Sequence, residues 1–242
     1  TLKQHYEVSE ELDGTRFAGI TLKWNYSAKH SERTCRTSMP GYINNIHVKF
    51  NHHMPTKRQL SPHKHREIVY GQITQIAHNE PYSPPLSDKG VKRIQGIIGA
   101  LLYYARAVDN KLRATLSTLS SQQATATEAT AEAVSQLLDY LATYPDDGTT
   151  YRSSDMILCA HADAGFHNES KGRSRAGAHI FMSKNDPFPR HNGPILSISQ
   201  ILKFVMSSAA EAELGALYTA AKELVPLRQT LDKMGWPQPR TP

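Results

Sequence analysis

Cysteine is scarce in this sequence of 242 residues, which contains only Cys35 and Cys159. The two cysteines lie far apart and form no C-x-x-C pattern, so neither a disulfide framework nor a thiolate zinc site is indicated. This usage is typical of a reducing environment, and we expect an intracellular location, cytoplasmic or nuclear.

Long apolar runs are also missing. The longest, IIGALLYYA at 97–105, is far shorter than the roughly 20 residues that a helix needs to cross a bilayer. The opening residues, TLKQHYEVSE, have none of the features of a secretory signal peptide. We therefore expect no membrane partner, and the polar start without methionine suggests a fragment of a longer polypeptide.

The sequence contains no P-loop, GxGxxG, HExxH or GxSxG motif. The histidine pairs His52/His53 and His63/His65 lack a third ligand at a set spacing, so we interpret them as exposed loop residues rather than a metal site. Positive charge is what the sequence has in excess. Its 28 lysines and arginines against 22 acids give a net charge of +6, which favours a polyanionic partner such as nucleic acid.

The first part of the chain, 1–50, has the pattern of a small strand and helix segment. Residues 16–24 alternate as a strand does, and 31–39 can return antiparallel to it. A helix is expected after Pro40, because Ile43, Ile46 and Phe50 recur at helical spacing. Residues 51–86 are rich in histidine and proline and show no sustained period, which indicates a loop or linker.

A helical region is expected over 87–150. Its first helix begins near Ser87 or Asp88, either of which can cap the N-terminus. A second helix is expected around 111–121, and a third ends at the turn PDDG, 145–148. The apolar stripe of the first helix consists of Val91, Ile94, Ile98, Leu101, Leu102 and Ala105.

The remaining segment, 151–242, changes to strands. Three candidates at 156–164, 175–183 and 193–199 precede one long helix over about 209–234. This order predicts an antiparallel meander followed by a helix, and with the helical region it gives an α+β fold. The apolar positions of the long helix are Leu214, Leu217, Ala221, Leu224, Leu231 and Met234.

Two carboxylates are candidates for chemistry. Asp163 lies at the exit of an apolar strand, where burying a carboxylate is costly unless a cation or donors compensate. With Leu214 as reference, Glu213 lies about 60° from the centre of the apolar stripe and Glu211 about 100°, so Glu213 is the one that can face inward. Two inward acids from different elements suit Mg²⁺. Taken alone, the residues favour plainer roles, a turn-forming Asp163 and a Glu213 that stabilises the helix dipole.

Two long stretches carry a family resemblance. HADAGFHNESKGRSRAGAHIFMS and GPILSISQILKFVMSSAAEAELGALYTAAKELVPLRQTL resemble the ribonuclease H region of Ty1/copia-type retrotransposon Pol polyproteins. Upstream, RIQGIIGALLYYARAVDNKL and AVSQLLDYLATYPDDGTTY resemble the connection between reverse transcriptase and ribonuclease H. RFAGITLKWNY and SMPGYINNIHVKF resemble the strands and thumb helix that follow the polymerase site. The resemblance covers nearly the whole chain and is strongest after about residue 84.

The resemblance implies particular roles. Asp163 matches the first catalytic carboxylate and Glu213 the second, with Glu211 as a non-catalytic neighbour. In this family four acids hold two Mg²⁺ ions for hydrolysis of the RNA strand of an RNA/DNA hybrid. The loop KGRSR, 171–175, can touch a phosphate backbone or be a solvated hairpin. The expected nucleic-acid contacts are Lys171, Arg173, Arg175 and Lys203.

The sequence departs from the family pattern at both ends. The third and fourth acids of the family are expected after residue 242, and the polymerase aspartates before residue 1. We therefore expect a truncated ribonuclease H-like domain over 151–242 with little or no hydrolysis and an open sheet edge that can take a protein partner. The alternative is a domesticated, non-catalytic nucleic-acid-binding or scaffolding subunit.

Overall fold

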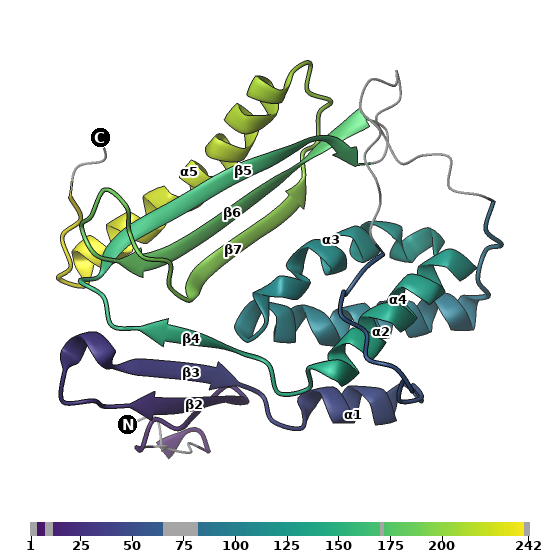
Figure 1. Ribbon diagram of the computed structural model, residues 1–242, viewed down its shortest axis with the longest axis horizontal. Helices are drawn as coiled ribbons and strands as arrows, with labels where there is room; N and C mark the ends of the chain where they lie inside the picture. The colour runs from purple at the N-terminus through teal and green to yellow at the C-terminus, as the bar shows by residue number, and fades with distance from the viewer. Residues whose placement is uncertain (1–3, 8–11, 65–81, 170–171, 240–242) are drawn as a thin grey trace.

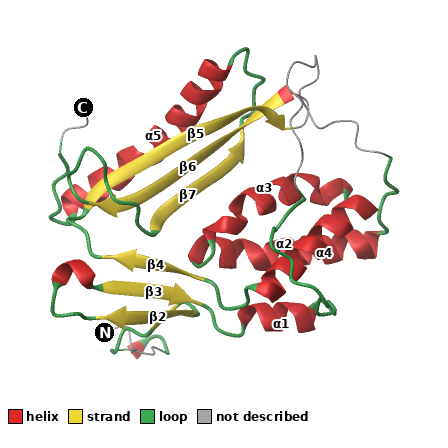
Figure 2. Cartoon of the chain, in the orientation of Figure 1, coloured by secondary structure: helices red, strands yellow, loops and turns green. Residues whose placement is uncertain are grey.

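The computed structural model describes residues 4–7, 12–64, 82–169 and 172–239. Within these ranges the chain forms two antiparallel sheets and five α-helices (Figures 1 and 2). The predicted α+β class is confirmed. No helix in this part of the chain combines the length and apolarity needed to span a membrane.

The first sheet has the order β1-β2-β3-β4. A turn with positive φ at Ala18 and Gly19 splits the single strand predicted over 16–24 into two. The return strand pairs antiparallel as expected. The bounds are β1 Arg16–Phe17, β2 Ile20–Asn25, β3 Thr34–Ser38 and β4 Gly148–Arg152, with a 3₁₀ turn at His30–Glu32.

The sequence patterns did not indicate strand β4. It pairs antiparallel with β3, with Cys35 opposite Tyr151. The N-terminal strands and residues 148–152, which lie more than 100 positions later in the chain, therefore share one sheet. The domain boundary expected between residues 150 and 151 falls inside β4.

The four helices that follow the first strands match the expected positions. Ser87 is the N-cap of α2, because its side chain accepts a hydrogen bond from the backbone N–H of Gly90. The described part of 51–86 contains no helix or strand. The bounds are α1 Tyr42–Lys49, α2 Asp88–Ala107, α3 Arg113–Gln122 and α4 Glu128–Thr143, with 3₁₀ turns at Asn110–Leu112 and Gln123–Thr125.

One hydrophobic core joins these four helices. Of the stripe predicted for α2, four residues are buried, and Val91 and Leu102 pack against them while partly exposed. α1 and α2–α4 thus form a single packed unit, although the loop 51–86 separates them in sequence. The core includes Ile43, Ile46, Ile94, Ile98, Leu101, Tyr104, Ala105, Leu112, Leu137, Leu138 and Leu141.

Residues 51–64 are attached to this unit by specific bonds. A ring nitrogen of His52 lies 2.7 Å from Asp139 Oδ1, and His63 bonds to Thr115. The prediction of exposed loop histidines is therefore wrong for His52, whose side chain is only 10% exposed. Its carboxylate partner on α4 is distant in sequence, which is why loop composition did not reveal it. His65 lies outside the described residues.

The second sheet has the order β5-β6-β7, all antiparallel, and confirms the predicted meander. α5 covers one face of this sheet, and α3 lies toward the other (Figure 1). The strands extend beyond the predicted ranges because their ends continue the pairing. The bounds are β5 Ile157–Glu169, β6 Arg173–Ser183, β7 Pro194–Ile201 and α5 Ala209–Lys233.

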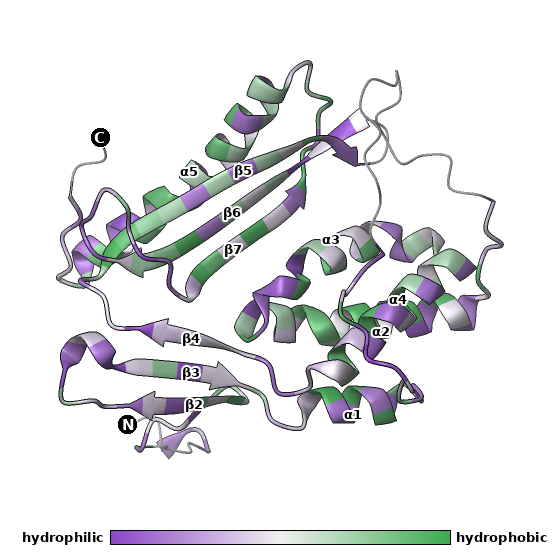
Figure 3. Ribbon diagram, in the orientation of Figure 1, coloured by the Kyte–Doolittle hydropathy of each residue, from purple (hydrophilic) through white to green (hydrophobic). Residues whose placement is uncertain are grey.

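The packed face of α5 differs from the predicted one. The helix buries the small residues Ala212, Ala216 and Ala220, whereas Leu214 is 64% exposed and Leu217 58%. The sheet presents Ala164 and Ala176 at this contact, so the helix approaches closely through a row of alanines at i, i+4 spacing. Hydropathy ranks leucine above alanine, so the prediction included exposed leucines and missed these alanines. Of the predicted positions, Leu231 is buried, and Ala221 and Leu224 are half-buried. Figure 3 shows hydrophobic residues distributed along α5.

Candidate functional site

Asp163 lies in the middle of β5, directly opposite Gly177 on β6. The next residue, Ala164, packs with Ala176 and Ala216 beneath α5. Because successive side chains of a strand point to opposite faces, Asp163 points to the face away from α5. Its side chain is exposed, and it makes no hydrogen bond or ion pair with any described residue. Its partner Gly177 has no side chain, and an added Cβ there would make only ordinary contacts, 3.8 Å from the carbonyl oxygen of Asp163 and 3.9 Å from that of Ile198.

Glu213 lies in the second turn of α5 and is exposed. Measured from the buried row Ala212–Ala216–Ala220 at about 100° per residue, Glu213 lies about 60° from its centre and Glu211 about 140°. Glu213 is thus the nearer of the two glutamates to the sheet, but the prediction that it faces inward is wrong, because the residue is exposed.

Glu211 has a structural role at the helix start. Its backbone N–H donates to the side chain of Ser208, the N-cap residue, at 3.1 Å. Its carboxylate accepts hydrogen bonds from the N–H and the hydroxyl of Ser207, both at 2.6 Å. The hydroxyl bond is the larger cause, with the N–H bond second, of a pKa for Glu211 below the usual glutamate value. These bonds satisfy groups that a helix N-terminus leaves free.

The two candidate ligands do not by themselves form a metal site. Asp163 points to one face of the sheet, while Glu213 belongs to the helix on the other face. The part of the chain that the structure describes contains no group of three or more His, Cys, Asp or Glu side chains that could hold a metal ion. Carboxylate oxygens are suitable Mg²⁺ ligands, but two acids on different faces do not make a two-ion site.

Arg175, one of the expected nucleic-acid contacts, is used inside the protein. Its guanidinium forms an ion pair with Glu169 at 2.5 Å and bonds to Ser199 at 3.1 Å and Thr118 at 2.9 Å. The side chains of the pair are only 12% and 13% exposed. Arg175 therefore connects the second sheet to α3.

The other three expected contacts have different surroundings. Arg173 pairs with Glu169 across the β5–β6 register and is partly exposed. Lys203 follows β7 and is exposed. Lys171 lies outside the described residues. Of the expected nucleic-acid contacts that the structure describes, only Lys203 belongs to the exposed class. It is therefore the cation of this set that is accessible to a phosphate group.

Three histidines near Asp163 were not identified from the sequence. His161 and His179 lie opposite one another on β5 and β6, on the same face as Asp163. Their rings and that of His191 surround Phe181, with His161 and His191 centroids 4.6 Å apart. Burial, the largest cause, lowers the pKa of His179. The sequence did contain a signal for His161. It precedes Asp163 by two residues in the predicted strand, and side chains at this spacing lie on the same face.

The outer edge of β5 is partly capped by a single side chain. The amide of Gln238 donates to the carbonyl of Met156 at 2.9 Å and accepts from the N–H of Leu158 at 2.8 Å. Because backbone groups alternate in direction along a strand, those of Ala160 and Ala162 point the same way. No strand of the described chain pairs with that side of β5, so the edge is open beyond Gln238.

Comparisons with known proteins identify no relative: no family model, curated protein or solved structure matches this chain.

Proposed function

We propose that residues 151–242 belong to a ribonuclease H-like domain of a copia-type retrotransposon polymerase and that the chain binds nucleic acid, with RNA/DNA hybrids as the expected ligand. The observation that supports this best is topological. Three consecutive antiparallel strands lead into one long helix on a face of their sheet. Asp163 lies in the first strand and Glu213 in the second turn of the helix, in the order that the quoted motifs imply.

The proposal includes hydrolysis only for a polypeptide that supplies more acids. In such a site, two Mg²⁺ ions activate water and stabilise the leaving oxygen. Asp163 and Glu213 are the ligands that this chain would contribute, and Glu211 stays with its serine partners. Because the family site uses four acids and this chain supplies two of them, we expect hybrid binding by this chain with little or no cleavage.

Two further elements belong to the proposal. Lys203 and Lys171 are the proposed phosphate contacts on this domain, while Arg175 is left out because its guanidinium is already bonded. The open edge of β5 is the proposed contact for a protein partner or the rest of a polyprotein, since unpaired strand groups accept another strand. An intracellular location, cytoplasmic or nuclear, fits the two free thiols.

A second candidate function is a non-catalytic nucleic-acid-binding or scaffolding subunit derived from a retroelement. The observation in its favour is the exposed apolar side of α5, where Leu214, Leu217 and Tyr218 are 58–71% exposed. A surface of this kind is typical of a contact with another protein or segment. Such a role needs neither metal ions nor Asp163.

A cleavage assay on an RNA/DNA hybrid with Mg²⁺ tests the choice. We would compare this chain with a version extended through the third and fourth acids of the family, and with Asp163→Asn, Glu213→Gln and Glu211→Gln in the extended version. We expect cleavage by the extended version, a loss of orders of magnitude with the first two substitutions, and little change with Glu211→Gln. An inert extended version, or full activity of Asp163→Asn, would reject catalysis and favour the subunit role.

A further inference from the structure

The outer edge of β5 and one side of α5 lie next to each other and form one surface. Gln238 bonds to the outward backbone groups of β5 only at Met156 and Leu158. The next outward groups, those of Ala160 and Ala162, pair with no strand of the described chain. α5 packs along β5 and β6 (Figure 1), so its outer side lies beside this open edge.

Arg228 shows which side of α5 faces the edge. Its Nη2 donates to the carbonyls of Gln238 at 2.9 Å and Pro239 at 2.5 Å, in the segment that covers the start of the edge. Four other residues lie within about 60° of Arg228 at about 100° per residue; they are Glu213, Leu217, Ala221 and Leu224. A mainly apolar side of the helix therefore runs beside the open strand.

The edge of β5 lacks the features that usually prevent pairing. Natural edge strands are protected by lysine, proline or a bulge. Residues 158–164 contain no lysine or proline, and the register with β6 is regular up to Gly165. The outward positions Ala160 and Ala162 have small side chains, which leave room for another strand close to α5. This edge can therefore add a strand.

The sequence of β5 matches an antiparallel copy of itself. When two copies pair about His161, Ala160 of each lies opposite Ala162 of the other. The backbone groups of these alanines point outward, so the two pairs exchange four hydrogen bonds. On the other face of the sheet, Asp163 lies opposite Cys159 of the second copy. The one charged side chain of this stretch therefore does not meet a like charge.

The position of α5 agrees with the same two-fold axis. Ala164 packs against the cluster that contains Ala216, and the chain after α5 leads to Gln238 at the start of β5, so helix and strand run in opposite directions. A strand rises about 3.3 Å per residue and a helix about 1.5 Å, so the helix position beside His161 is near residue 222.

An axis at this position pairs α5 with its own copy. Leu217 lies beside Leu224 of the second copy, and Glu213 beside Arg228, because both pairs are centred within about two residues of that position. Since α5 lies above both β5 and β6, the axes of the two helices are about 10 Å apart, as in ordinary helix packing. The opposite charges of Glu213 and Arg228 make the surface complementary to itself.

We propose that this surface is the interface of a symmetric homodimer, in which β5 pairs with β5 and α5 packs on α5, so that the two three-stranded sheets become one. The proposal rests on the part of the proposed function that assigns a protein contact to the edge of β5, and it specifies a second copy as the partner. It needs no metal ion or nucleic acid, so its failure would leave hybrid binding and cleavage untouched. The ladder is short, and we expect a dissociation constant of about 10–100 μM.

Sedimentation velocity over a range of protein concentrations, in EDTA and without nucleic acid, measures the dimer. Ala162→Pro removes an outward N–H that makes no bond to β6, a position where an edge strand tolerates proline. Leu217→Lys places a charge in the helix contact. Each variant should weaken the dimer at least about tenfold. Tyr218→Lys, about 100° further round α5 and on an exposed residue, should dimerise like the wild type.

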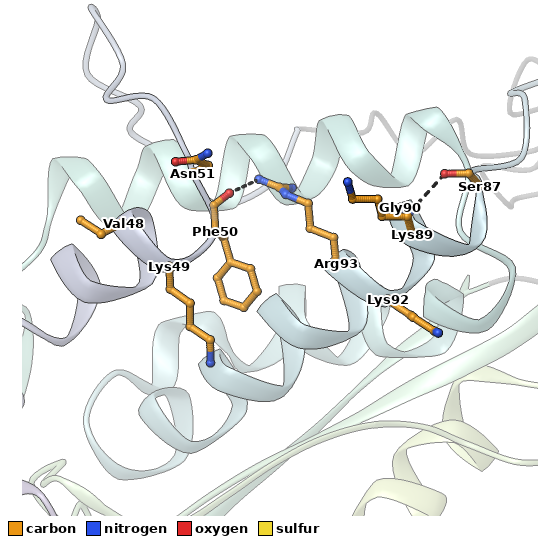
Figure 4. A pocket seen from close by; sticks show the side chains of 9 residues that line it. All are labelled: Val48, Lys49, Phe50, Asn51, Ser87, Lys89, Gly90, Lys92 and Arg93. Carbon is orange, nitrogen blue, oxygen red and sulfur yellow. Dashed lines mark hydrogen bonds between the residues drawn. The ribbon is translucent and has the colours of Figure 1, made fainter.

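A charge exchange tests the antiparallel arrangement of the two helices. Glu213→Arg and Arg228→Glu each bring like charges together and should weaken the dimer about three- to tenfold. The double variant Glu213→Arg/Arg228→Glu should recover most of the loss. Lys89→Glu changes the net charge as Arg228→Glu does, but it lies in a basic hollow between α1 and α2, away from this surface (Figure 4). It should dimerise like the wild type.

Several outcomes would overturn the proposal. A wild-type chain that stays monomeric at the highest concentration would leave the edge to a different partner. Unchanged dimerisation of Ala162→Pro, equal effects of Leu217→Lys and Tyr218→Lys, or no recovery in the double variant would exclude this interface for any dimer that forms. Thermal unfolding followed by circular dichroism checks that each variant is folded.

Discussion

The two units of the molecule differ most in how they bury their apolar residues. In the helical unit, α1–α4 enclose a continuous core of isoleucine, leucine and tyrosine side chains with little or no exposure. In the second unit, the cluster beneath α5 consists of Ala176, Leu202 and Ala216. The other buried apolar residues of its sheet and helix are fewer than in the helical unit and include two further alanines; they are Ile180, Phe181, Met182, Ala212, Ala220 and Leu231. Leu214, Leu217 and Val225 on α5 are 56–64% exposed. The first unit thus has the core of an independent domain, while the second has apolar surface available for a further contact.

The largest loss of stability is expected for a leucine in the core of the helical unit, with an exposed leucine of the second unit as its control. Leu138 is fully buried, whereas Leu217 is 58% exposed. Leu138→Ala should reduce the free energy of unfolding by about 2–5 kcal/mol, because it removes packed methyl groups and leaves a cavity. Leu217→Ala should change it by about 0.5 kcal/mol or less. Urea unfolding followed by circular dichroism measures both, and equal effects would show that the α5 leucine is covered in solution.

The next effect concerns the connection between the units. Arg175→Met leaves the carboxylate of Glu169 without its partner in a site that is only 13% exposed. It also removes the bond to Thr118 on α3. We expect a loss of about 2–4 kcal/mol, since an uncompensated buried charge is strongly destabilising.

A double variant provides the control for this prediction. Adding Glu169→Gln to Arg175→Met removes the unpaired charge and should restore part of the loss. The urea concentration at the midpoint of unfolding, measured for the wild type and both variants, gives the loss and its partial recovery. If Arg175→Met unfolds at the wild-type midpoint, neither the ion pair with Glu169 nor the bond to Thr118 contributes measurably to stability.

The same contrast explains what could be predicted from the sequence. In α2, the apolar stripe at helical spacing gave the buried face, because large side chains fill that core. In α5, the stripe was right at Leu231 and wrong at Leu214 and Leu217, because the residues packed in the first half of the helix are alanines and the contact depends on how closely helix and sheet approach. Strand β4 was missed because its pairing with β3 depends on residues far away in the chain.

The candidate site shows a similar limit. The strand and the helix that carry Asp163 and Glu213 were predicted. The prediction was wrong in two details, because Asp163 lies in the middle of β5 and not at the exit of the strand, and Glu213 is exposed and does not face inward. The face to which Asp163 points depends on which side of the sheet α5 covers, and the periodicity of β5 does not contain that information. The internal role of Arg175 was also hidden, because its partner Thr118 lies in another unit.

A smaller effect tests the close contact beneath α5. Ala216 is 1% exposed and lies against Ala176 and Leu202. Ala216→Leu should destabilise the second unit by about 1–3 kcal/mol, because the added atoms have no space. Ala210→Leu, on the exposed side of the same helix, is the matched control and should be nearly neutral. Limited proteolysis of the β5–α5 region would report the difference, and equal resistance of the two variants would argue against the alanine contact.

The smallest effect concerns the caps that begin α2 and α5. Both helices start at a serine, but only α5 adds a carboxylate, that of Glu211, bonded to the hydroxyl and N–H of Ser207. These bonds lower the pKa of Glu211 in the folded state. Their stabilisation is therefore present above the unfolded glutamate pKa of about 4.3 and is lost as pH falls through the folded value.

Removal of the Ser207 hydroxyl should raise the pKa of Glu211 without returning it fully to the ordinary value, because the backbone N–H still donates. Ser207→Ala therefore weakens the pH dependence that the α5 cap contributes below about pH 5. Ser87→Ala, at the α2 cap, removes a bond between uncharged groups and should lower stability by about 1 kcal/mol at all pH values. NMR titration of the Glu211 carboxyl in the wild type and in Ser207→Ala measures the shift. Identical titration curves would mean that the helix dipole, rather than the serine, sets the pKa, because the dipole acts on an acid in the first turn in both proteins.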